Sequence, residues 1–127
     1  SGTIDLSTAD YVLVGEHSYD QAGSTVSDVG DVNGDGLGDI LVDALRYDGS
    51  FQRQGAAYVV LGRSLSTSRE IDLSDADHRL AGDSADRFVG RAVSSAGDVD
   101  GDGLDDVVVG SGHGPDWNGA ADIVTTR

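Results

Sequence analysis

Two short acidic segments carry the side chains best suited to chemistry in this sequence. They read DVNGDGLGD over residues 31–39 and DVDGDGLDD over residues 98–106. Each places oxygen-bearing side chains at positions 1, 3, 5 and 9 of a nine-residue loop, with glycines at positions 4 and 6. Carboxylates this close repel one another unless a cation lies between them, and Ca²⁺ takes roughly six to eight hard oxygen ligands in a flexible shell. The spacing therefore predicts two calcium loops.

Two simpler explanations of these loops are weaker. Asp, Asn and Gly also form turns without any metal, but two copies with the same ligand spacing favour a metal loop. An EF-hand needs a bidentate Glu at position 12 and a helix on each side. Position 12 is occupied by Val42 and Val109, within the β-branched runs 40–42 and 107–109, which are typical of strands. The pattern thus predicts a calcium loop between two strands.

The chain contains an internal repeat. Ile4-Asp5-Leu6-Ser7 recurs as Ile71-Asp72-Leu73-Ser74, and the two acidic loops share the same offset in residue number (71 − 4 and 98 − 31). Gly55-Ala56-Ala57 recurs at Gly119, Ala120 and Ala121 with a slightly smaller offset, so the second copy is shorter in a loop near 47–54. We predict a single propeller segment over residues 1–127, with repeat 1 at about 4–70 and repeat 2 at about 71–127.

The apolar pattern predicts an all-β fold with four short strands in each repeat. The runs 40–42 and 107–109 are apolar at every position, which indicates burial on both faces. Four-stranded sheets repeated along a chain are typical of propeller blades, so we predict two four-stranded antiparallel β-propeller blades per chain. The expected strands are Ile4–Leu6 with Tyr11–Val14, Ser24–Val29, Asp39–Ala44 and Ala56–Leu61, and then Ile71–Leu73 with Arg79–Ala81, Arg91–Ala96, Asp106–Ser111 and Ala120–Thr125.

Composition excludes several classes of partner. The 127 residues carry a net charge of −15 with eight basic residues, so no basic surface is available for nucleic acid. No stretch is long and apolar enough for membrane insertion, no signal peptide is visible, and the chain has no cysteine for a disulfide framework. Two bound Ca²⁺ ions would reduce the charge to −11 (−15 + 4). Calcium loops without a bidentate Glu suit extracellular calcium levels, so we expect an extracellular or cell-surface location.

The residues around the loops resemble a known family, the FG-GAP repeats of integrin α-subunit-type β-propellers. The resemblance lies in Phe88-Val89-Gly90, in residues 94–110 and, in the first copy, in residues 30–42. The copies depart from the family at Gln21-Ala22-Gly23, at Asp43-Ala44-Leu45 and at Gly110-Ser111-Gly112, which leaves both loops intact. The resemblance implies calcium ligands from the side chains of Asp31, Asn33, Asp35 and Asp39 with the Leu37 carbonyl, and from Asp98, Asp100, Asp102 and Asp106 with the Leu104 carbonyl.

Two blades cannot close a ring, because propellers have about four to eight. The family's strand order implies that the N-terminal strand precedes a blade to which it does not belong and that the last blade lacks its outer strand. We therefore expect self-association head to tail, with a homotrimer of six blades favoured over a homotetramer of eight. The alternative is that the chain is part of a longer propeller. The expected role is structural or interactive, with the identity of any protein or glycan ligand open.

Two other functions compete with this interpretation. A carbohydrate-binding, lectin-like propeller could use Trp117 at the rim, where an aromatic ring could stack on a sugar. An enzyme is not expected, because no acid–base pair or nucleophile lies outside the two loops. His17, His78 and His113 are scattered along the chain without a serine or cysteine partner at a recognisable spacing.

Overall fold

The protein is all-β, and a computed structural model describes residues 2–66, 68–112 and 118–126. The strands in these ranges are β1 Val12–Val14, β2 Ala22–Gly30, β3 Asp39–Ala44, β4 Ala56–Val60, β5 Glu70–Asp72, β6 His78–Ala81, β7 Val89–Gly97, β8 Asp106–Ser111 and β9 Ala120–Val124. Three short 3-10 turns accompany them, namely η1 Leu6–Thr8, η2 Gly62–Ser66 and η3 Leu73–Asp75. None of these helical turns is long and apolar enough to cross a membrane.

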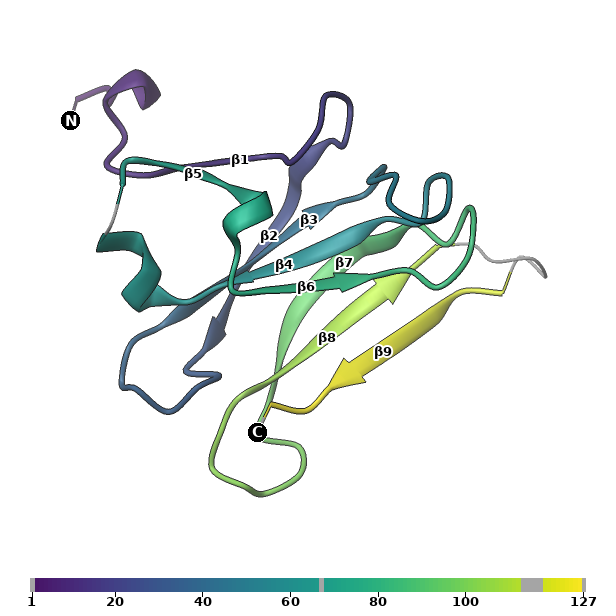
Figure 1. The fold of residues 1–127 in the computed structure, drawn as a ribbon. Coiled ribbons are helices and arrows are strands. Elements are labelled where there is room, and N and C mark those ends of the chain that lie inside the picture. Colours follow the sequence, from purple (N-terminus) through teal and green to yellow (C-terminus); the bar gives the residue numbers. More distant parts are fainter. Residues whose placement is uncertain (1, 67, 113–117, 127) are drawn as a thin grey trace.

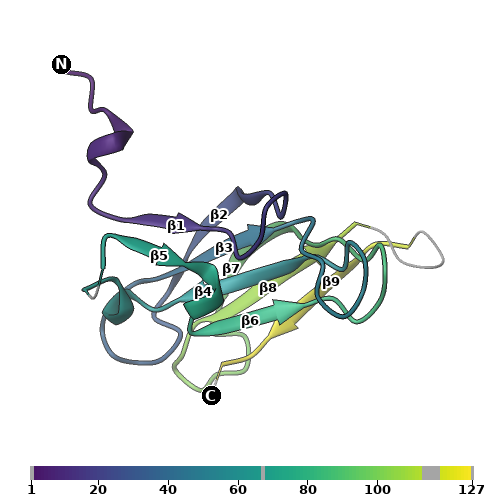
Figure 2. The same ribbon diagram turned by 45° about the horizontal axis from the view of Figure 1, so that its top comes forward.

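The strands form two antiparallel sheets and one small parallel pair. The first sheet has the order β2-β3-β4-β6, and the second has the order β7-β8-β9. Strands β1 and β5 pair in parallel, with Leu13 opposite Ile71, and lie beside the first sheet in Figures 1 and 2. Small antiparallel sheets repeated along the chain are the arrangement expected of propeller blades, and we call the first and second sheets the first and second blades.

The core lies on both faces of the first sheet. Ala57 and Val59 on β4 point towards β7 and β8 of the second sheet, in a cluster that also contains Leu41, Val107 and Val109. The alternate residues of β4 point to the opposite face, because successive side chains of a strand alternate. There Ala56, Tyr58 and Val60 join a second cluster, covered by Leu73 and by Leu13 of β1. Every residue of β4 is therefore buried.

The third strand of each repeat has the predicted bounds. Strands β3 and β8 cover Asp39–Ala44 and Asp106–Ser111, and the buried pattern of β3 confirms that this strand is covered on both faces. The fourth strands also lie where expected and end one residue earlier, at Val60 and Val124. Continuous β-branched runs are thus sufficient to locate the centre of each blade.

The first strand of repeat 1 was predicted incorrectly in its N-terminal part. Ile4 lies outside any strand, whereas its counterpart Ile71 lies in β5. Leu6 and Leu73 both lie in 3-10 turns, η1 and η3, so the predicted strand end at Leu73 is also wrong. The counterpart strand β5 pairs with β1, while no described strand pairs with the segment around Ile4. A strand needs a neighbour to satisfy its backbone groups, so the same sequence remains irregular where that neighbour is absent.

The prediction of two four-stranded blades holds for the first sheet, whereas within the described residues the second sheet lacks an outer strand, as the family's strand order implies. Strand β6 forms the outer edge of the first sheet, pairing Leu80 with Ala57. Within the described residues the second sheet has three strands, and none pairs with the outer edge of β9. The outer strand of the first blade, β6, comes from the beginning of the second repeat. The described residues contain no third repeat, so no strand fills the same place in the second blade.

Gly55 allows the two sheets to approach closely. It has a φ of +72°, and a Cβ at this position would lie 2.3 Å from the backbone N and O of Val89. A bridge between Gly55 and Val89 joins the loop before β4 to the start of β7. Any side chain here would combine a strained backbone with a steric clash, so this contact between the blades requires glycine.

Asp43 is a buried charge within the first blade, and its replacement by Asn tests the cost of that charge. One carboxylate oxygen accepts a hydrogen bond of 2.7 Å from the Thr25 amide, whereas the other has no hydrogen-bond partner among the described residues. Burial raises the pKa of the Asp43 carboxyl above its usual range. The folded protein therefore holds the Asp43 proton more tightly than the unfolded chain does. This contributes to the free energy of unfolding at low pH, and the contribution is lost as the pH rises through the raised pKa.

We expect Asp43→Asn to increase the free energy of unfolding at pH 7 by about 1 kcal/mol, the scale of an uncompensated buried polar group. The gain should shrink as the pH falls through the raised pKa of Asp43 and disappear below about 4, where the wild-type carboxyl is protonated in both states. Urea unfolding at pH 7 and pH 3.5 measures the difference. An equal gain at both pH values would show that charge is not its cause.

Candidate metal sites

Both acidic loops lie at the same end of the molecule, next to each other. The first connects β2 to β3 and the second connects β7 to β8, and both lie in the lower part of Figure 1. In each case the ninth residue of the motif is the first residue of the following strand, Asp39 for β3 and Asp106 for β8. The sheet thus positions one end of each loop.

The first aspartate of each loop organises the turn through backbone hydrogen bonds. Asp98 accepts from the amides of Gly101, Asp102 and Gly103 at 2.7, 3.0 and 2.8 Å. Asp31 accepts from the corresponding amides of Gly34, Asp35 and Gly36 at the same three distances. These bonds hold the pKa of the Asp31 carboxyl below its usual value, with the Gly36 amide the largest contributor. The two loops therefore share one backbone conformation.

The last aspartate of each loop is buried and connects the loop to the sheet. Asp106 accepts from the Val99 amide and the Thr126 amide, one on each oxygen, at 2.8 Å. The bond from Thr126 is the main reason that the pKa of Asp106 is lowered. Asp39 does the same with the amides of Val32 (2.8 Å) and Gly62 (2.9 Å). Both oxygens of each carboxylate are thus engaged by backbone donors, in bonds that are stronger for a charged acceptor.

The second loop brings three carboxylates together. Oxygens of Asp98, Asp100 and Asp106 all lie within 4.8 Å of one another. Loss of hydration raises the pKa of the Asp100 carboxyl, and the carboxylates of Asp102 and Asp106 add to the effect. A divalent cation would relieve this repulsion, and an all-oxygen donor set fits Ca²⁺ or Mg²⁺ better than softer metals.

The first loop has an amide in place of one of those carboxylates. Asn33 stands where the second loop has Asp100, and its side-chain oxygen accepts from the Asp35 amide at 3.1 Å. The equivalent bond in the second loop, from the Asp102 amide to Asp100, has the same length. An amide oxygen also serves as a calcium ligand, so the donor set of the first loop fits the same cation with one negative charge fewer.

The two loops contact each other through Asp105, which sequence reasoning missed. The Asp105 carboxylate accepts from the Asp31 amide at 3.0 Å, and the Asp105 amide donates to the Asp31 carbonyl at 3.3 Å. Gly30 makes room for this contact, because a Cβ there would lie 2.0 Å from a carboxylate oxygen of Asp105. The sequence offered one sign of this contact: the eighth position of the loop is Gly38 in the first copy and Asp105 in the second.

Comparison with known proteins identifies the repeat. Residues 89–124 match the model of the FG-GAP repeat, a range that contains the second loop and strands β7 to β9. The chain carries an integrin-type FG-GAP repeat. Together with the sheet topology, the match indicates a β-propeller module.

The relatives of this FG-GAP chain include several integrin α subunits. It is 35% identical to integrin alpha pat-2 of Caenorhabditis briggsae over 116 residues, or 91% of the chain and 9% of that protein. It is 37% identical to human integrin alpha-X over 109 residues, which are 80% of the chain and 9% of that protein. It is 31% identical to integrin alpha-PS2 of Drosophila melanogaster over 105 residues, which are 82% of the chain and 7% of that protein. The chain thus spans less than a tenth of the length of these relatives.

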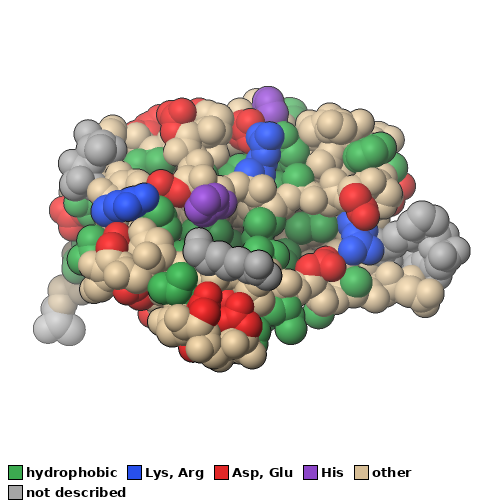
Figure 3. Space-filling model, turned by 60° about the horizontal axis from the view of Figure 1, so that its bottom comes forward, with side chains coloured by type: hydrophobic (Ala, Val, Ile, Leu, Met, Phe, Trp, Pro, Cys, Tyr) green, Lys and Arg blue, Asp and Glu red, His purple; other side chains and the backbone are tan. Residues whose placement is uncertain are grey.

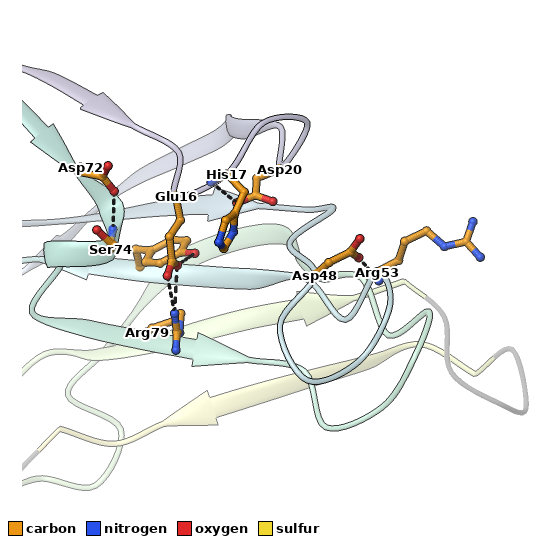
Figure 4. Close-up of polar contacts among 9 residues, drawn as sticks. Glu16, His17, Asp20, Asp48, Arg53, Asp72, Ser74 and Arg79 are labelled. Atoms are coloured by element: carbon orange, nitrogen blue, oxygen red, sulfur yellow. Dashed lines mark hydrogen bonds and ion pairs between the residues drawn. The ribbon is translucent and has the colours of Figure 1, made fainter.

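A separate polar cluster lies away from the metal loops, at the first blade. Figure 4 shows Glu16 pointing towards Arg79, and both Glu16 oxygens accept from this guanidinium at 2.9 Å. The Tyr58 hydroxyl donates to Glu16 at 2.8 Å, and burial together with Glu16 raises the pKa of Tyr58. These contacts join β4 and β6 to the segment before β2, so the cluster stabilises the outer half of the blade.

The remaining candidate side chains take no part in the metal loops. His17 lies beside Asp20, with its Nδ1 3.4 Å from the carboxylate, and the ring is half exposed. His78 lies on β6 and is exposed. His113 and Trp117 lie outside the described residues, so the carbohydrate-binding alternative stays a prediction.

The buried and exposed aspartates of the second FG-GAP loop should differ in their effect on stability without metal. We expect Asp106→Ala to lower the free energy of unfolding by about 3 kcal/mol, because two backbone amides lose a charged acceptor. Asp102→Ala removes one exposed bond to the Leu104 amide, so its cost should stay below about 1 kcal/mol. Urea unfolding in EDTA measures both. Similar losses for the two variants would contradict the structural role assigned to Asp106.

Proposed function

We propose that the chain is a calcium-binding FG-GAP β-propeller module with a structural and interactive role. The observation that carries the proposal is the convergence of the Asp98, Asp100 and Asp106 oxygens within 4.8 Å, in a loop whose hydrogen bonds are repeated in the first copy. The proposed ligands are the residues at positions 1, 3, 5 and 9 of each loop with the carbonyl at position 7, namely Asp31, Asn33, Asp35, Leu37 and Asp39, and Asp98, Asp100, Asp102, Leu104 and Asp106.

Calcium in these loops would act on folding rather than on catalysis. Each loop joins two neighbouring strands, so a cation held by both ends of the loop would fix the hairpin. Ligands that bind the folded state alone convert binding energy into stability. Sites of this type have dissociation constants on the order of 10⁻⁴ to 10⁻³ M, which suits the extracellular location that we propose. No catalytic role is assigned to the chain.

Removal of calcium tests this function. At about 1 mM Ca²⁺ and a dissociation constant of about 10⁻⁴ M, each site would contribute about 1.4 kcal/mol. We therefore expect EDTA to lower the melting temperature by on the order of 10 °C relative to 1 mM Ca²⁺, measured by circular dichroism. An unchanged melting temperature would overturn the calcium proposal.

Matched loop variants provide the control for this measurement. Asp35 and Asp102 occupy the same position in the two loops, and both are exposed. We expect Asp102→Ala to remove more of the calcium-dependent shift than Asp35→Ala, because the second loop offers four carboxylates and the first offers three and an amide. Equal losses would indicate that the charge of the donor set does not determine affinity.

We further propose that the chain associates head to tail into a closed propeller, with three copies giving six blades. Support comes from the second sheet, which has three strands within the described residues, and from large apolar side chains on the outer surfaces, including Ile4 and Ile123, which are 81% and 58% exposed. Figure 3 shows hydrophobic side chains lying open on the lower face, among acidic and basic groups. Exposed apolar surface and a free strand edge both favour association.

Solution mass tests the association. Light scattering in 1 mM Ca²⁺ and moderate salt should give a mass near three times the chain mass of 13.0 kDa. A mass near four times that value would replace the trimer by a tetramer. A folded species with the mass of a single chain would overturn the head-to-tail proposal.

A further inference from the structure

The N-terminal segment and its counterpart in the second repeat have the same local structure in different surroundings. Asp5 caps η1 by accepting from the Ser7 amide, and Asp72 caps η3 by accepting from the Ser74 amide, both at 2.9 Å. Yet Ile4 and Leu6 are each 81% exposed, whereas Ile71 and Leu73 are 9% and 1% exposed. The N-terminal segment therefore carries apolar side chains that its own copy buries.

The second blade shows the same contrast on the face that corresponds to the one the first blade turns towards the second sheet. Ile123 on β9 is 58% exposed, while its counterpart Val59 on β4 is 4% exposed. Val99 is 52% exposed, while its counterpart Val32 is 4% exposed. Strand β4 is covered by β6 on its outer edge, and no described strand covers β9 in this way. The counterpart of β6 within the chain is β1, which lies one repeat earlier.

We propose that β1 of a second copy of this chain pairs antiparallel with β9 and completes the second blade. The proposal rests on the head-to-tail association proposed above and adds its register. Strand β6 pairs with β4 through Ala81 opposite Ala56, Leu80 opposite Ala57, Arg79 opposite Tyr58 and His78 opposite Val59. Replacing each residue by its counterpart in the other repeat places Val14 opposite Ala120, Leu13 opposite Ala121, Val12 opposite Asp122 and Tyr11 opposite Ile123.

The position of β1 in its own chain agrees with this pairing. Leu13 packs against the core cluster of the first blade that faces away from the second sheet. Leu80, its counterpart, packs against the cluster shared by the first and second sheets. Strand β1 is thus already seated against its own blade as the outer strand of a preceding blade would be. The preceding blade would be the second blade of the neighbouring copy.

Within the described residues, no strand pairs with the edge of β1 that this pairing needs. The Val12 amide donates to the Arg69 carbonyl at 2.8 Å, so the amides of Val12 and Val14 point towards β5. Alternate amides of a strand point to opposite edges, which leaves Tyr11 and Leu13 to bond β9 of the second copy. Val12 and Asp122 then form a non-hydrogen-bonded pair, in which side chains approach most closely.

The groove between β6 and β9 provides a place for the side chains of the added strand. Two adjoining cavities of about 410 and 530 Å³ lie there, and both are lined by Leu80 and Val124. Asp122 borders the first of them. Directly opposite residues of an antiparallel pair lie on the same face, so Val12 and Val14 would lie over this groove. In the single chain these two valines are 39% and 38% exposed.

Disulfide trapping tests the register directly, because the native chain contains no cysteine. A chain with Val12→Cys is mixed with a chain carrying Asp122→Cys under mild oxidation in 1 mM Ca²⁺ and moderate salt. At equal amounts and with random assembly, about one interface in four places a Val12→Cys strand beside an Asp122→Cys strand, so about half of the protein should form the mixed disulfide. We expect this yield to be at least tenfold higher than in the matched mixture of Tyr11→Cys with Asp122→Cys. The control differs by one residue of register, which places the two side chains on opposite faces.

The outcomes separate this proposal from those on which it rests. Oligomers by light scattering without preferential trapping of the Val12–Asp122 pair would overturn the register and leave the association standing. A folded monomer without trapping would overturn both, as expected if another part of a longer polypeptide completes the blade. The calcium-dependent melting shift is read independently of either result.

Discussion

The buried carboxylates of Asp39 and Asp106 are the interaction on which both blades depend. Each lies at the first position of a central strand and accepts one backbone hydrogen bond from its own loop and one from the residue beyond the neighbouring strand. A buried carboxylate without such donors would be very costly, so the loop and the sheet must form together. Asp39 and Asp106 are also the last residues of the two loop motifs. The same carboxylates therefore stabilise the sheet and belong to the candidate metal sites.

This arrangement couples the metal loops to the contact between the blades. Asp105 links the second loop to the backbone of Asp31, the first residue of the first loop. Gly55 brings the blades together at the start of β7. The Glu16, Tyr58 and Arg79 cluster strengthens the outer strands instead. A cation in one loop would therefore act on a rigid unit containing two blades, which is the property expected of a structural propeller module.

The two copies of the repeat show that similar sequences can be exposed or buried, depending on the segments that lie beside them. The segments that begin at Ile4 and Ile71 share residues and capping, and one is exposed while the other is buried. The difference comes from neighbours, because β5 has β1 beside it and the first segment has no described strand partner. Unsatisfied edges and exposed apolar side chains at both ends of the chain have the same origin. The proposed association would cover them.

The sequence by itself determined the all-β class, the repeat, the central strands and the two loops, because these depend on local patterns of β-branched, acidic and glycine residues. The family resemblance, rather than these patterns, implied that the last blade lacks an outer strand. Only the tertiary structure decided that β5 pairs in parallel with β1 and that Asp105 links the loops. It also decided that Ile4 and Leu6 remain outside any strand. These features depend on contacts between segments that lie far apart in the chain. The local periodicity of side chains carries no information about such contacts.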